Sequence, residues 1–100
     1  MNILITLTQG AIKNGYINLR GNLDKFESRY IGASGEEQHG HMLLLDIGDG
    51  ETFGSDVCST YHRFRNRTAL KALVKKFGVK AGDTISLKKL SNSHWSISKM

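Results

Sequence analysis

Short segments of β-branched and aromatic residues recur along the whole chain, and several of them alternate between apolar and polar side chains. Such segments read as β-strands. They occupy residues 3–8, 16–20, 42–47, 52–57, 61–67, 84–88 and 94–98. Seven short strands separated by turns favour a barrel or sandwich over a parallel α/β sheet. Alternation predicts that Ile17, Leu19, Trp95 and Ile97 point into the core.

Two local signals complete the predicted fold. Gly-Asp-Gly-Glu at residues 48–51 contains an Asp-Gly pair, which is typical of a tight hairpin turn. Residues 68–77 carry apolar side chains at helical spacing, with Thr68 as the predicted N-cap and Gly78 as the stop. The apolar stripe of this helix consists of Leu70, Leu73, Val74 and Phe77. We expect a mainly β fold with one or two short helices, in which this helix plugs an open end of a barrel and residues 23–31 form an irregular segment.

Composition limits the chain to few classes. One hundred residues without proline predict a single domain over residues 1–100. The sequence has no apolar run long enough to span a bilayer and no signal-peptide pattern, so no membrane partner is expected. The single Cys58 excludes an internal disulfide and fits a reducing, cytoplasmic compartment.

The excess positive charge is concentrated in one part of the chain. The sequence has 14 basic and 9 acidic residues, a net charge of +5. Residues 57–82 contain seven basic residues and no acid, so the rest of the chain carries seven basic and nine acidic residues. A basic stretch of this kind predicts a positively charged face that meets a polyanion.

Arg63, Arg65 and Arg67 alternate within this stretch. In a strand they would form one row with Tyr61, while Phe64 points into the core. Arginine suits bidentate contact with phosphate and with guanine. Hydroxyl, imidazole and amide side chains accompany the row at Ser59, Thr60, His62 and Asn66. The pattern indicates an edge that reads DNA; the alternative is an ordinary edge strand kept soluble by charge.

Other polar groups carry weaker signals. Residues 20–25, Arg-Gly-Asn-Leu-Asp-Lys, are typical of a turn, but beside the arginine segment they would form the other jaw of a grip. His39 and His41 lack further metal ligands at suitable spacing, which favours a solvated loop. We expect no metal, no cofactor and no catalysis. A small metal-dependent nuclease remains an alternative, and its carboxylates would be Asp46, Asp49 and Glu51.

Three stretches resemble the B3 family of DNA-binding pseudobarrels. They are Leu-Thr-Gln-Gly-Ala-Ile at 7–12, the segment from Leu-Asp-Lys-Phe at 23–26 to Ile-Gly at 31–32, and Leu-Val-Lys-Lys-Phe-Gly-Val-Lys-Ala-Gly-Asp at 73–83. Phe-Arg-Asn-Arg at 64–67 resembles the bacterial branch, which supplies recognition or effector domains of restriction endonucleases. The chain departs from the family in having Phe26-Glu27 where a proline often follows the aromatic, and Ala69-Leu70 in place of Gly-Trp.

The resemblance implies an open seven-stranded barrel that holds the major groove of double-stranded DNA with two arms. The first arm would comprise residues 9–13 and 20–25, and the second residues 59–63. It also implies a cytoplasmic, nucleoid-associated role in bacteria, with a nuclease domain in the same chain or a separate one. Predicted base-edge contacts are Arg20, Asn22, Asp24, Ser59, Thr60, Tyr61, His62 and Arg63. Predicted phosphate contacts are Lys13, Lys25, Arg65, Arg67 and Lys71, and Gln9 and Asn66 complete the predicted DNA interface. A non-specific nucleic-acid binder and a module for an acidic protein partner remain alternatives.

Overall fold

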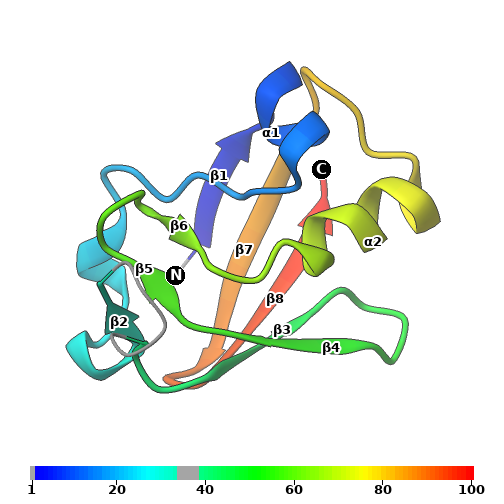
Figure 1. Cartoon of the computed structure of the whole chain (residues 1–100). Coiled ribbons are helices and arrows are strands. Elements are labelled where there is room, and N and C mark those ends of the chain that lie inside the picture. Colours follow the sequence, from blue (N-terminus) through cyan, green and yellow to red (C-terminus); the bar gives the residue numbers. More distant parts are fainter. Residues whose placement is uncertain (1, 34–38) are drawn as a thin grey trace.

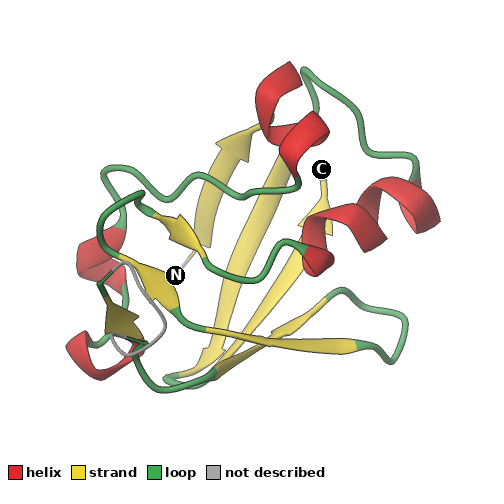
Figure 2. Ribbon diagram, viewed as in Figure 1, coloured by secondary structure: helices red, strands yellow, loops and turns green. Residues whose placement is uncertain are grey.

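The computed structural model describes residues 2–33 and 39–100, which form a mainly β fold with two short α-helices, as predicted (Figures 1 and 2). A five-stranded sheet has the order β1 (Asn2–Thr6), β7 (Thr84–Ser91), β8 (His94–Lys99), β3 (Leu43–Asp46), β4 (Thr52–Ser55). A three-stranded sheet has the order β2 (Ile31–Gly32), β5 (Val57–Cys58), β6 (Arg63–Phe64). The strand pairings of the described residues do not close a barrel, so the open seven-stranded barrel stays a prediction.

The large sheet combines hairpins with pairings between strands far apart in the sequence. β1 pairs antiparallel with β7, β7 with β8 and β3 with β4, while β3 runs parallel to β8. The predicted hairpin turn joins β3 to β4. Its glycines, Gly48 and Gly50, have φ values of 91° and 90°, a left-handed conformation that glycine adopts without steric cost. Asp46 Oδ1 accepts a hydrogen bond from the Gly48 N–H at 2.8 Å, which tightens the turn.

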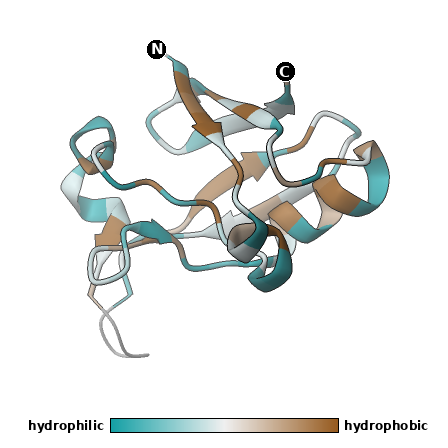
Figure 3. Ribbon diagram, turned by 90° about the horizontal axis from the view of Figure 1, so that it is seen from above, coloured by the Kyte–Doolittle hydropathy of each residue, from teal (hydrophilic) through white to brown (hydrophobic). Residues whose placement is uncertain are grey.

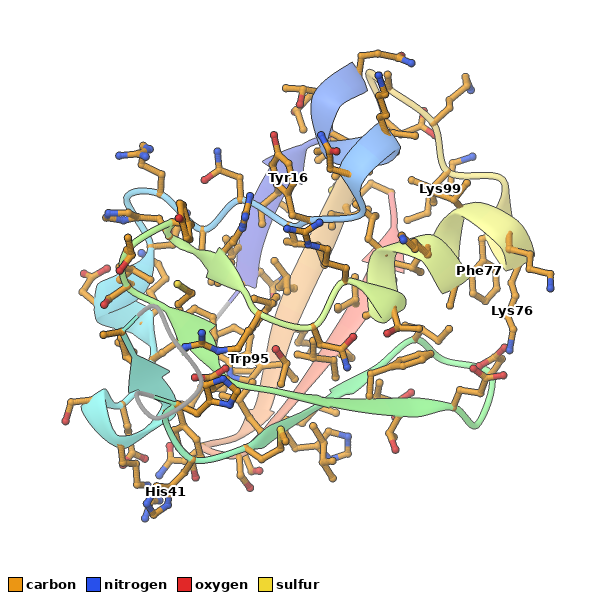
Figure 4. All side chains as sticks on the ribbon, in the orientation of Figure 1. Tyr16, His41, Lys76, Phe77, Trp95 and Lys99 are labelled. Carbon is orange, nitrogen blue, oxygen red and sulfur yellow. The ribbon has the colours of Figure 1, made fainter. Side chains whose placement is uncertain are left out.

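The core lies between the two sheets and the helices. Figure 3 marks the apolar residues along the strands and α2, and Leu70 and Leu73 of α2 are buried together with alternate residues of the strands. Phe26 joins the two sheets, because its ring contacts Phe64 of β6 at 5.7 Å and Trp95 of β8 at 4.7 Å between centroids. Trp95 is fully buried (Figure 4), which excludes it from stacking on bases. The predicted inward positions of Ile17, Leu19, Trp95 and Ile97 are confirmed.

Helix α1 (Gln9–Asn14) was not predicted, because its six residues are too short to show a periodic pattern. The Thr8 side chain accepts a hydrogen bond from the Ala11 N–H at 3.1 Å and caps the start of the helix. Gly15 ends the helix in the left-handed conformation, with φ 75°. The expected strand at residues 3–8 therefore ends at Thr6, and two further residues lead into α1.

Helix α2 (Thr68–Phe77) matches its predicted span, but Thr68 is not its N-cap. Arg67 occupies the cap position without a side-chain hydrogen bond. Asn66 Oδ1 instead accepts from the Thr68 N–H at 2.7 Å and from the Thr68 hydroxyl at 2.6 Å. Gly78 ends the helix as predicted, and Phe77, expected in the apolar stripe, is 43% exposed in the last turn.

The remaining segments are irregular. Residues 16–20 do not form the expected strand; a single bridge joins Asn18 to Arg63. Two 3-10 turns, η1 (Leu23–Lys25) and η2 (Ser28–Tyr30), occupy the segment predicted to be irregular. The expected loop at residues 32–37 lies largely outside the described residues. No helix within residues 2–33 and 39–100 is long and apolar enough to cross a membrane.

Candidate nucleic-acid interface

The two predicted arms lie side by side. The Leu19 N–H donates a hydrogen bond to the His62 carbonyl at 2.6 Å, and Asn18 bridges Arg63. The segment between α1 and η1 therefore runs along the turn between β5 and β6 (Figure 1). This pairing brings residues 20–25 next to residues 59–63, although forty positions separate them in the sequence.

Arg63 lies at the centre of this surface, between two tyrosine rings. Its guanidinium carbon is 4.7 Å from the centroid of Tyr16 and 4.8 Å from that of Tyr61. Such cation–π contacts hold an arginine in place without a carboxylate. Tyr16 (Figure 4) comes from the segment after α1, and Tyr61 lies in the turn between β5 and β6, so the contacts of Arg63 join these two segments. The sequence suggested Tyr16 only as a ring that could stack on unpaired bases, and its contact with Arg63 is visible only in the tertiary fold.

Four cations among the predicted DNA contacts, Arg20 at a base edge and the others at phosphates, have no ionic partner within the described residues. Lys13, Arg20, Arg67 and Lys71 are exposed, and no described residue forms an ion pair with their side chains. Their positions follow from the elements that carry them. Lys13 lies in the last turn of α1, Arg20 in the segment that pairs with the β5–β6 turn, and Arg67 and Lys71 at the start of α2.

Gly15 packs α1 against the start of α2. A Cβ atom at this position would lie 2.8 Å from Lys71 Cε and 3.2 Å from the Arg67 carbonyl oxygen. Only glycine therefore allows the two helices to approach this closely, and the approach places Lys71 and Arg67 next to the first arm.

Gly15→Ala is expected to lower the free energy of unfolding by about 1–2 kcal/mol for the left-handed backbone, plus the cost of displacing α2. Gly21→Ala is the matched control: Gly21 has φ 83°, and a Cβ atom there would meet nothing within 4 Å. Chemical denaturation should show the larger loss for Gly15→Ala. Equal losses would show that the contact with α2 carries no energy.

The predicted row of three free arginines is wrong. β6 ends at Phe64, and Arg65 is bound within the protein. Arg65 Nε donates to Asp56 Oδ1 at 2.7 Å, and Nη2 donates to Asp56 Oδ2 at 3.0 Å and to the Ala33 carbonyl at 2.7 Å. Asp56 is only 3% exposed and also accepts from the Gly40 N–H at 2.8 Å. A buried bidentate pair of this kind stabilises the fold and leaves little of Arg65 for a phosphate.

The Asp56–Arg65 pair makes stability depend on pH. Burial acts to raise the pKa of Asp56, but hydrogen bonds from Arg65 and the Gly40 N–H outweigh burial and hold the pKa below its ordinary value. A carboxyl whose pKa is lower in the folded state stabilises the protein above its unfolded pKa, and this stabilisation is lost as the pH falls through the folded pKa.

We therefore expect the free energy of unfolding to decrease as the pH is lowered past about 4, where carboxyl groups of unfolded chains begin to take up protons. Denaturation curves recorded from neutral pH to about pH 2 should show this loss for the wild-type chain. Asp56→Asn removes the titrating group, and its stability should change less over the same range. If the free energy of unfolding of the two proteins changed equally with pH, the loss of stability could not be assigned to Asp56.

Two other predicted contacts hold the fold. Asn66 Nδ2 donates to the Gly54 carbonyl at 2.8 Å, while its Oδ1 receives the bonds from Thr68 described above. The Ser59 N–H donates to the Gly32 carbonyl at 2.8 Å, so the Ser59 backbone is fixed beside β2. Asn66 is therefore a capping residue rather than a free amide for a base edge.

The remaining members of the predicted interface differ in their surroundings. His62 has a left-handed backbone with φ 55°, an uncommon conformation outside glycine, and its Nδ1 is buried without a described hydrogen-bond partner. Asn22 Nδ2 makes a long contact of 3.5 Å to the Arg20 carbonyl. Lys25 lies 3.9 Å from Asp24, whose side chain is 82% exposed, a geometry that contributes little to stability. Gln9 and Thr60 are also exposed.

Two acidic residues of the nuclease alternative, Asp49 and Glu51, lie at the turn between β3 and β4 and pair with a lysine of α2. Lys76 of α2 donates hydrogen bonds to Asp49 Oδ2 at 2.8 Å and to Glu51 Oε1 (Figure 4). The pKa of Lys76 is raised, mainly by its hydrogen bond to Asp49 and next by its hydrogen bond to Glu51. The hydrogen bond from Lys76 in turn lowers the pKa of Asp49. Within the described part of the chain, no three histidine, cysteine or acidic side chains come together as a metal site, and this includes Asp46 and His39.

The comparisons with known proteins leave the function to be argued from the structure. No protein-family model, no curated protein and no solved structure matches this chain.

Proposed function

We propose that this chain is a sequence-specific double-stranded DNA-binding domain that contacts the major groove through two adjacent arms. The observation that carries the proposal is the surface around Arg63, where the first arm, the β5–β6 turn and the start of α2 meet. Guanidinium, ammonium, hydroxyl and amide groups on one surface are the donors that contact phosphates and base edges.

The charges on this surface suit a polyanion. Four acids of the described residues lie beside a basic partner away from this surface: Asp56 beside Arg65, Asp49 and Glu51 beside Lys76, and Asp83 within 3.6 Å of both Lys80 and Lys99. Besides Arg63, the cations without a described ionic partner on the proposed surface are Lys13, Arg20, Arg67 and Lys71. Cations gathered on one surface favour the binding of an anionic ligand there.

The finer assignments follow from the B3 resemblance and belong to the same proposal. The two sheets would be parts of an open pseudobarrel, and the domain would act in the bacterial cytoplasm as the recognition or effector domain of a restriction endonuclease. Cleavage would be carried by a different domain, since Asp49 and Glu51 of the nuclease alternative are bound to Lys76.

A single-stranded nucleic acid is the second candidate, and the observation that favours it is Tyr61. Tyr61 is 56% exposed and lies among the cations of the proposed surface. Exposed aromatic rings next to cations are the usual stacking platforms for unpaired bases.

Fluorescence anisotropy over a range of salt concentrations distinguishes these candidates. Four phosphate contacts predict a log–log slope of about −4 for a duplex. The proposal requires a duplex to bind more tightly than either of its separated strands. Tighter binding of the single strands would establish the second candidate, and binding that does not respond to salt would contradict both.

A further inference from the structure

Arg63 differs from every other basic residue of the interface in how its side chain is held. Tyr16 and Tyr61, from two different segments, lie against its guanidinium at 4.7 and 4.8 Å. Its backbone is fixed as well, since it pairs with Cys58 of β5 and bridges Asn18. No carboxylate of the described residues binds it, in contrast to Arg65.

This arrangement orients the hydrogen-bond donors of Arg63 without using them. Arg63 Cζ lies 4.7 and 4.8 Å from the two ring centroids. A guanidinium that stacks on an aromatic face keeps its five N–H donors, which lie in its own plane, free for a ligand. Stacking therefore restricts the plane of the group and leaves its donor edge for a ligand. An ordered side chain also loses less conformational entropy when it binds, which favours a contact that depends on geometry.

The place of Arg63 on the surface favours a base over a phosphate. Tyr16 follows directly after Gly15, which packs against Lys71 and Arg67, and Arg20 lies on the other side, beyond Asn18. Lys71 and Arg67 therefore adjoin one end of the segment that contacts Arg63, and Arg20 follows its other end, and we expect these cations to contact phosphates. A central, planar and pre-oriented pair of donors matches the N7 and O6 acceptors that guanine presents in the major groove.

We infer that Arg63 reads one guanine of the target site, and that Tyr16 and Tyr61 are positioning residues that fix its guanidinium for this contact. The inference rests on the proposed DNA-binding function and adds to it the base that is recognised and the residues that orient the reader.

The test uses the duplex sequence that the full chain enriches from a random double-stranded pool. Each guanine of that sequence is replaced in turn by 7-deazaguanine, which lacks the N7 acceptor but keeps Watson–Crick pairing. One replacement should weaken wild-type binding by about tenfold or more. The same replacement should have no effect on Arg63→Ala, and Arg63→Lys should lose the discrimination although it keeps the charge.

Tyr61→Leu tests the positioning role, and its exposure makes it the safer of the two tyrosine variants for folding. It should reduce the 7-deazaguanine effect several-fold while the salt slope stays unchanged, because no phosphate contact is lost. Circular dichroism and thermal unfolding check that each variant is folded.

The outcomes separate this inference from the proposed function. Specific binding that tolerates every 7-deazaguanine replacement overturns the guanine assignment and leaves DNA binding intact. If 7-deazaguanine weakens binding by Arg63→Ala as much as binding by the wild type, another residue contacts the guanine. If it weakens binding by Tyr61→Leu as much as binding by the wild type, the positioning role of Tyr61 is overturned. Failure of the wild-type chain to bind any duplex overturns the proposed function itself.

Discussion

Arg65→Ala is expected to lower the free energy of unfolding by about 3 kcal/mol, whereas Arg67→Ala should change it by less than about 0.5 kcal/mol. The two arginines alternate in the sequence and look equivalent there. In the structure Arg65 makes two hydrogen bonds to Asp56, which is 3% exposed, and Arg67 makes no side-chain bond to a described residue. Removing Arg65 leaves a buried carboxylate without its counter-ion, and this is the costly event.

Chemical denaturation of the two variants and the wild-type chain measures the difference directly. Arg65→Lys provides a further control, since it keeps the charge but cannot reproduce the bidentate geometry, and its stability should lie between those of the wild type and Arg65→Ala. Similar stabilities for Arg65→Ala and Arg67→Ala would show that the pair with Asp56 does not support the fold.

The double variant Arg67→Ala, Lys71→Ala should weaken duplex binding on the order of 50-fold at about 0.1 M salt and reduce the log–log salt slope by about 2. Both side chains are exposed at the start of α2, next to the first arm, and no described residue pairs with them. Each is assigned one phosphate, so the loss should be similar for all duplex sequences.

Lys88→Ala with Lys89→Ala is the matched control for this prediction. Both lysines lie in β7, toward the hairpin with β8 and away from α2 (Figure 1), and the control removes the same total charge. Its salt slope should equal that of the wild type. Equal losses in the two double variants would mean that net charge, rather than a defined surface, determines binding.

Local signals predicted the parts of the fold that depend on neighbouring residues. The Asp-Gly turn joins β3 to β4, Gly78 ends α2, and Trp95 and Ile97 point inward, because each of these features follows from backbone preference or from the period of a strand. Helix α1 escaped prediction because a helix of six residues has too few positions to show a period, although Thr8 and Gly15 carry its capping signals.

The interface could be predicted only in part, because its contacts are long-range. The basic stretch predicts a positively charged face, and the structure pairs Leu19 with His62 and bridges Asn18 to Arg63. The binding of Arg65 by Asp56 depends on the register of β5 with β6, which aligns Val57 with Phe64. The contact of Tyr16 with Arg63 joins residues far apart in the chain, and no spacing rule reveals such a pair.

The partner of the acidic turn between β3 and β4 is also a long-range contact that the sequence does not reveal. No lysine follows Glu51 at short spacing, yet Lys76 of α2 reaches both Asp49 and Glu51. The carboxylates that sequence reasoning left open for a metal therefore have a cationic partner that only the packing of α2 against the hairpin supplies.

Selection of bound duplexes from a random double-stranded pool, with the full 100-residue chain at moderate salt, tests the central claim most directly. The proposed function predicts a short enriched motif, and the role assigned to Arg63 predicts that the motif contains a fixed guanine. Binding without any enriched motif would contradict sequence-specific recognition and would reduce the surface around Arg63 to a non-specific site for phosphates.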